Sequence, residues 1–185
     1  MYAETRKAVE ATGAFITLVR SVSIKDLLEE DKKREQRRFD HSWVNSSETM
    51  WATIPPRMEV FIDPKAVRIE GSNRLSTDEQ KAKIAQAETR FKERLPEGVR
   101  PFVSLIMAGP STYSQLEDAW MDVGNGLLFP DYFARTNVQT VRGGVADVGR
   151  YDPDGQRTVG GWDRDDGYDD VFAVPVGVLP QKLAA

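Results

Sequence analysis

The most apolar short run of the chain is 102–108, Phe-Val-Ser-Leu-Ile-Met-Ala. A run of this length is typical of a buried strand, and the Gly-Pro pair that follows would end it. Ser111 or Thr112 can then cap a helix over 112–123. Four apolar residues of that helix fall on one stripe, which we expect to pack on a sheet: Leu116, Ala119, Trp120 and Val123.

Similar patterns predict further elements on the N-terminal side of this run. Residues 14–20 are rich in β-branched and large apolar side chains and predict a strand. Ser76 and Glu79 have the spacing of a capping box, which predicts a helix from there to about Leu95. The segments 57–63 and 67–70 flank a Pro-containing turn and predict a β-hairpin. In the first of these strands, Met58, Val60 and Ile62 should share one face, and Glu59 and Phe61 the other.

The segment from Ser23 predicts a helix of an unusual kind. Ile24, Leu27 and Leu28 give it an apolar start, whereas 29–38 is almost wholly charged. A helix that is polar on every side has no face to bury. We therefore expect the charged part to project into solvent or to lie beside a partner.

The composition changes after Gly124. No glutamate follows Glu117, and aspartate and glycine become common, as expected in turns between strands. Residues 145–151 and 156–162 flank Asp-Pro-Asp-Gly at 152–155, which predicts a second hairpin. The final apolar run, 171–179, is interrupted by Pro175, which predicts an edge strand or a bulge.

Together these elements predict one α+β domain over 1–185. We expect a mixed, mostly antiparallel sheet with two or three helices packed on it. Residues 1–124 form the helix-rich part of this domain, and residues 125–185 form the part rich in strands and turns.

Composition narrows the function classes. The net charge of −4 gives no general support for binding nucleic acid, and no segment is apolar enough to span a membrane. The chain has no cysteine, which excludes thiol catalysis and thiolate metal sites. With no apolar signal segment at the N-terminus, we predict a cytoplasmic protein.

Two groups of carboxylates could hold a divalent cation. Asp163, Asp165 and Asp166 offer the oxygen ligands that Mg²⁺ or Ca²⁺ prefers, although their spacing does not match an EF-hand. Glu59, Asp63 and Lys65 resemble the carboxylates and lysine with which a magnesium-dependent nuclease activates water. The same residues are also typical of solvated turns.

Other devices for catalysis have less support. His41 is the only histidine, so any serine-histidine device would depend on it, and no Gly-x-Ser-x-Gly elbow presents a serine. The Gly-Pro-Ser-Thr segment at 109–112 lacks the lysine and the glycine spacing of a phosphate-binding loop. We therefore predict no set of catalytic residues.

A partner surface is the remaining candidate site. Aromatic side chains cluster in 127–133, and the following segment alternates so that its polar side chains share one face. Tyr, Phe and Arg are enriched where proteins contact partners, although such aromatics can equally close the end of a core. The predicted partner-binding residues are Phe129, Tyr132, Phe133, Arg135, Asn137 and Gln139.

These observations predict a non-catalytic, acidic, protein-binding module that needs no cofactor. It could be an inhibitor or immunity-type partner, in which acidic groups steer association with a basic protein, or a subunit of a larger assembly, including self-association. The alternative is a hydrolase or nuclease that depends on Mg²⁺ or Ca²⁺. It would use Glu59, Asp63 and Lys65, or the C-terminal aspartates.

Overall fold

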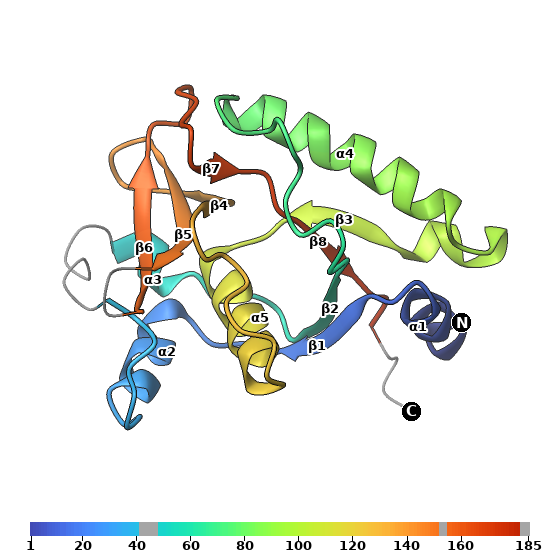
Figure 1. The fold of residues 1–185 in the computed structure, drawn as a ribbon, viewed down its shortest axis with the longest axis horizontal. Helices are drawn as coiled ribbons and strands as arrows, with labels where there is room; N and C mark the ends of the chain where they lie inside the picture. The colour runs from blue at the N-terminus through green and yellow to red at the C-terminus, as the bar shows by residue number, and fades with distance from the viewer. Residues whose placement is uncertain (41–47, 152–154, 182–185) are drawn as a thin grey trace.

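Two four-stranded sheets and the helices around them form an α+β fold, as predicted (Figure 1). A computed structural model describes residues 1–40, 48–151 and 155–181. The predicted turn at 152–155 lies mostly outside the described residues, and His41 lies outside them altogether. None of the described helices has the length and apolar character needed to cross a membrane.

The first sheet combines strands from both ends of the chain. Its order is β1 (Phe15–Val19), β2 (Met58–Ile62), β8 (Pro175–Val178) and β3 (Ser104–Met107), with every neighbouring pair antiparallel. The predicted hairpin is therefore wrong in part. Residues 67–70 form no strand, and β2 pairs with β1 and β8 instead.

The second sheet comes from the C-terminal part alone. Its order is β6 (Arg157–Trp162), β5 (Val145–Tyr151), β4 (Phe133–Gln139) and β7 (Val171–Phe172). The β5–β6 pair is antiparallel, as the predicted hairpin requires, whereas β4 and β7 are parallel.

The final apolar run is divided between the two sheets. Residues 171–172 pair with β4 in the second sheet, and 175–178 lie between β2 and β3 in the first. The prediction of a single edge or bulged strand is therefore wrong. Pro175 is the first residue of an interior strand, where it pairs only with Met107 of β3, so its missing N–H costs no bond to β2.

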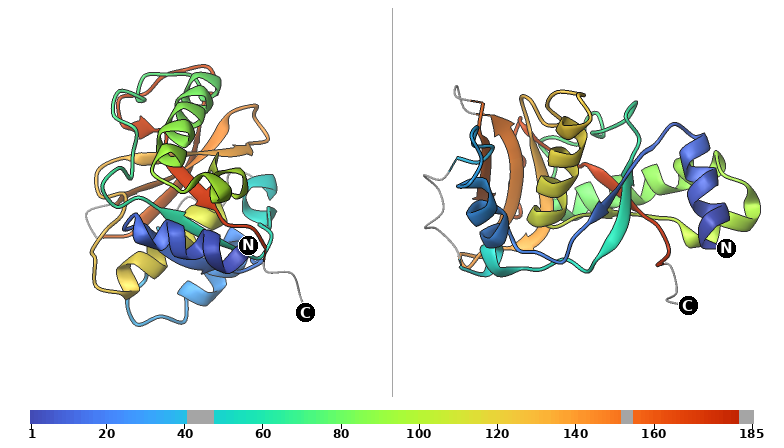
Figure 2. Two further views of the ribbon diagram at one scale, coloured as in Figure 1. Left: turned by 90° about the vertical axis from the view of Figure 1, so that its right-hand side faces the viewer. Right: turned by 90° about the horizontal axis from the view of Figure 1, so that it is seen from below.

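The helices enclose these sheets (Figure 2). α5 (Pro110–Asp122) contacts β1 of the first sheet and β5 of the second, and α4 (Thr77–Glu93) packs along β3. α1 (Tyr2–Ala11) contacts the 3₁₀ helix η2 (Glu97–Phe102), while α2 (Ile24–Asp31) contacts α3 (Glu48–Ala52).

The capping box predicted for α4 is present, because the Ser76 and Glu79 side chains each accept from the other's backbone amide. The α5 prediction is confirmed in part: Leu116 is fully buried, Trp120 is half-buried against Phe15, and Val123 is exposed. Gly109, rather than a serine or threonine, occupies the N-cap, because Pro110 is suited to the first helical position.

The charged helix over 29–38 does not form. α2 ends at Asp31, whose buried carboxylate accepts hydrogen bonds from the amides of Arg38 (2.9 Å) and Phe39 (3.1 Å). These bonds bring Arg38 and Phe39 back to the end of α2, so the charged residues between Asp31 and Arg38 form a loop and not a helix. Phe39 then bridges to Arg157 at the edge of β6.

The first sheet buries both of its faces. Val60 and Ile62 belong to the main core, which lies between this sheet, α5 and the second sheet. Phe61 points to the opposite face and packs against Phe91 of α4, with 5.1 Å between ring centroids. The alternation predicted for β2 is therefore present, and its second face supports α4.

Candidate ligand-binding groove

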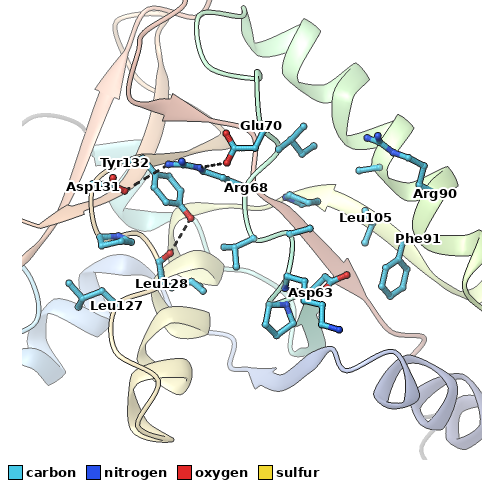
Figure 3. Close-up of a pocket in the computed structure, with 18 of the residues that line it drawn as sticks. Asp63, Arg68, Glu70, Arg90, Phe91, Leu105, Leu127, Leu128, Asp131 and Tyr132 are labelled. Atoms are coloured by element: carbon cyan, nitrogen blue, oxygen red, sulfur yellow. Dashed lines mark hydrogen bonds and ion pairs between the residues drawn. The ribbon is translucent and has the colours of Figure 1, made fainter.

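An open groove of about 770 Å³ lies among the described residues. Figure 3 shows residues that line it. One wall comes from α4 and β3, and the other from the 127–132 loop. The 63–70 segment passes between these walls. Apolar side chains from all three parts line it: Val67, Ile69, Ala87, Phe91, Leu105, Leu127, Leu128 and Pro175.

The 63–70 segment is held at both ends. At its start, the Asp63 carboxylate accepts from the Lys65 amide (3.0 Å) and forms an ion pair with Arg94. At its end, the Ile69 amide donates to the Ala173 carbonyl (2.9 Å), in the link between β7 and β8. The groove is therefore shaped by a fixed segment. Asp63 forms a turn, which was the alternative to its predicted role in a metal site.

Arg68 ties this segment to the 127–132 loop. Its guanidinium lies over the rings of Tyr132 and Phe172, at 4.9 and 4.5 Å from their centroids. It also pairs with Glu70 at 2.9 Å and approaches Asp131 at 3.8 Å, as Figure 3 shows. Stacking and ion pairing together fix Arg68 at the groove wall.

Glu117 of α5 anchors the 127–132 loop. The Glu117 carboxylate accepts from the amides of Leu128 (3.2 Å) and Phe129 (3.1 Å). It also pairs with Arg157 of β6 at 2.8 Å, and both side chains are fully buried. A buried ion pair between α5 and the second sheet therefore positions one wall of the groove.

Comparison with known proteins adds no relative. No family model, curated protein or solved structure matches the chain.

Most of the predicted partner-binding residues are inside the protein. Phe129, Tyr132 and Phe133 are buried in the core, because Phe129 packs edge-to-face against Tyr113 and Tyr132, and Phe133 against Trp162. Only Asn137 and Gln139 of the predicted set are exposed. The set therefore does not form a continuous partner surface in this fold.

Arg135, the remaining member of that set, is buried because the 163–166 loop wraps around it. Its guanidinium donates to the carbonyls of Asp163, Arg164 and Asp166 at 3.0–3.4 Å, and to the Thr77 hydroxyl at 2.9 Å. This arrangement joins β4 to the start of α4. An arginine side chain thus organises the loop in which a metal site was predicted.

The carboxylates of that loop point to other partners. The Asp163 side chain accepts from the Asp165 amide (3.0 Å), which is a common turn geometry, and Asp165 and Asp166 are exposed. The second predicted set is separated as well. Glu59 pairs with Tyr2 and Arg6 of α1, while Asp63 pairs with Arg94 of α4. Within the described ranges, no three His, Asp or Glu side chains could hold a metal ion together.

Asp147 is a further buried ionisable group whose burial sequence reasoning missed. It is directly opposite Arg135 in the β4–β5 ladder, and only 1% of it is exposed. Neither oxygen of its carboxylate completes a hydrogen bond of good geometry within the described structure. Burial raises the pKa of Asp147 well above that of a free aspartate, and Asp170 adds to this effect, although the positive charge of Arg135 opposes it.

This raised pKa predicts how stability depends on pH. Below pH ~4 Asp147 is protonated in both the folded and the unfolded state. As the pH rises, the unfolded state loses its proton first, which favours unfolding until Asp147 also ionises in the folded state. The free energy of unfolding of wild type, minus that of Asp147→Asn, should therefore fall by up to about 1.4 kcal/mol per pH unit in this window.

Urea unfolding of both proteins between pH ~4 and ~8 measures this difference. The Asn variant serves as the control, because it retains the shape of the side chain and cannot titrate. A difference that rises with pH would contradict the expectation. It would show that Asp147 is ionised and stabilised by Arg135 in the folded protein.

Proposed function

We propose that this protein is a non-catalytic binding module, which holds a segment of another protein in the groove between α4 and the 127–132 loop. The observation that carries the proposal is a groove of about 770 Å³ with an apolar lining, in which buried and stacked contacts fix the 127–132 wall and the crossing 63–70 segment. Walls that are ordered before binding lower the entropic cost of holding a ligand. The proposal needs no metal or cofactor and is compatible with the cytoplasmic location predicted from composition.

The ionisable groups of the lining favour binding over chemistry. Asp63, Glu70 and Asp131 each face an arginine. The Tyr132 hydroxyl donates to the Leu128 carbonyl at 3.0 Å, and burial raises its pKa above that of a free tyrosine, so it is a poor proton donor. These groups fix the walls and leave the apolar surface between them for contact.

The test is selection from a library of short random peptides against the wild-type protein. Peptides that bind in the groove should lose affinity by at least about tenfold in Ala87→Gln, because the longer side chain occupies space in the groove. The matched control is Ala82→Gln, since Ala82 is exposed on α4 and is absent from the groove lining. Fluorescence anisotropy of labelled peptides measures the affinities.

Two outcomes would overturn the proposal. The first is a failure to enrich any peptide that binds the folded protein. The second is a set of peptides that bind wild type, Ala87→Gln and Ala82→Gln equally, because their site would then lie elsewhere. Circular dichroism establishes that each variant is folded before its affinity is compared.

A further inference from the structure

Two cations of the groove lining are not neutralised by any described residue. Lys65 lies in the crossing segment and Arg90 on α4, and both are exposed. Neither side chain forms an ion pair with any described residue, whereas Arg68 and Arg94 both do. Lys83 lies on the same helical stripe as Ala87 and Arg90, at spacings of four and three residues, and forms no ion pair with the described part of the chain.

This local charge opposes that of the whole molecule. The chain carries a net charge of −4, yet the groove lining has an excess of one positive charge, because its four cations are Lys65, Arg68, Arg90 and Arg94 and its three carboxylates are Asp63, Glu70 and Asp131. The carboxylates contact Arg68 and Arg94, which leaves Lys65 and Arg90 without a carboxylate partner among the described residues. An excess of cations in a cleft of an acidic protein raises the local concentration of ligands of complementary charge. Here the complementary ligand is an anion.

The floor of the groove between Lys65 and Arg90 is apolar, so a ligand that fills it needs an apolar group as well as negative charge. Phe91 and Leu105 lie there, and Leu127 is 39% exposed on the opposite wall. The backbone of β3 contributes little, because the Leu105 amide already donates to the Glu88 carboxylate at 2.8 Å. A peptide therefore cannot use this amide to add a strand to the sheet, and we infer that recognition comes from the side chains of the lining.

We propose that the occupant of the groove is an acidic, extended segment of another protein, with carboxylates beside Lys65 and Arg90 and an apolar side chain on the floor. This inference rests on the proposed function and specifies the chemistry of the partner. The sequence predicted a basic partner, because the whole chain is acidic. The groove instead favours an acidic partner segment.

The test compares two peptide libraries that share their apolar positions. One library carries Asp and Glu at the remaining positions, and the other carries Lys and Arg. Binders to wild type should come from the acidic library, and replacing their carboxylates with amides should weaken binding by about tenfold at low salt. This difference should shrink at high salt, because the contacts are exposed to solvent.

Charge variants of the protein locate the contact. Arg90→Glu combined with Lys65→Glu should weaken the acidic peptides by at least about tenfold. The control makes the same change of charge elsewhere, in Lys33→Glu combined with Arg37→Glu, because both residues are exposed in the loop after α2 and line none of the described pockets. It should leave the affinity unchanged within about twofold.

The outcomes separate this inference from the proposed function. If basic or uncharged peptides bind and Ala87→Gln abolishes their binding, the groove is a binding site but its occupant is not acidic. If no peptide of any charge binds, both proposals fail. Sedimentation measures self-association, and an oligomer that Arg90→Glu disrupts would identify a second copy as the occupant and overturn the inference.

Discussion

Replacement of Arg157 by methionine is expected to lower the free energy of unfolding by about 3–5 kcal/mol. The Arg157 side chain is fully buried and contacts Glu117 at 2.8 Å, the Ser114 carbonyl at 2.8 Å and Asp118 at 2.5 Å. Its guanidinium also lies 4.5 Å from the centroid of the Phe39 ring. Without it, Glu117 remains as a buried charge without its nearest cation, which is among the most costly changes in a core.

Urea unfolding provides the measurement, and two variants provide the controls. The double variant Arg157→Met with Glu117→Gln should recover much of the loss. It removes both charges, and the glutamine oxygen can still accept from the Leu128 and Phe129 amides. Arg74→Met removes an arginine whose ion pair with Asp169 is 71% exposed on both sides, so it should cost at most about 1 kcal/mol. If Arg157→Met lowers the free energy of unfolding no more than Arg74→Met does, the buried ion pair is not a major source of stability.

Gly177→Ala is the second large effect that we expect. Gly177 lies in the interior strand β8, opposite Phe61 of β2 on one side and Leu105 of β3 on the other. The Phe61 ring lies directly over this glycine, and a Cβ atom added there would overlap it. Because Phe61 is 1% exposed and packs against Phe91, it has no open space to enter. The substitution should cost about 1–3 kcal/mol or more.

Thermal and urea unfolding measure this cost. Gly98→Ala is the matched control, because nothing lies within 4 Å of a Cβ at Gly98 and its φ is not positive. That change should be neutral or slightly stabilising. Phe61→Leu should partly rescue Gly177→Ala by removing the overlapping part of the ring. A Gly177→Ala variant as stable as Gly98→Ala would show that the ring can move aside.

Sequence reasoning succeeded where local pattern decides the structure. The helix over Thr77–Glu93 is specified by its own capping box, and the alternation of β2 by side chains two residues apart. Leu116 is likewise buried by the stripe to which it belongs. In each case the residues that determine the element are close together in the chain.

Sequence reasoning failed where pairing between distant segments decides the structure. Nothing in 171–179 indicates that its two halves join different sheets, because the partners are β4 for one half and β2 and β3 for the other. Pro175 marks the position of the change, but a proline has the same local meaning at an edge, in a bulge or at the start of a strand.

The candidate site was missed for a related reason. Arg135 and Arg157 look like surface residues in sequence, since a charged side chain is rarely buried unless it is paired. Their partners, the carbonyls of the 163–166 loop and the carboxylates of α5, come from other elements. A weak signal exists at Arg157, which shares its strand face with the buried Val159 two residues on. The groove has no such signal, because three separate segments form it.

The position of β8 also bears on how the chain folds as it is synthesised. β2 and β3 leave the ribosome long before residues 175–178, yet the structure gives them no direct pairing with each other. Until the last strand arrives, each exposes an unpaired backbone edge, the kind of surface on which nascent chains aggregate. Such late closure between distant segments is intrinsically slow. The growing chain is therefore most prone to aggregate before β8 has been synthesised.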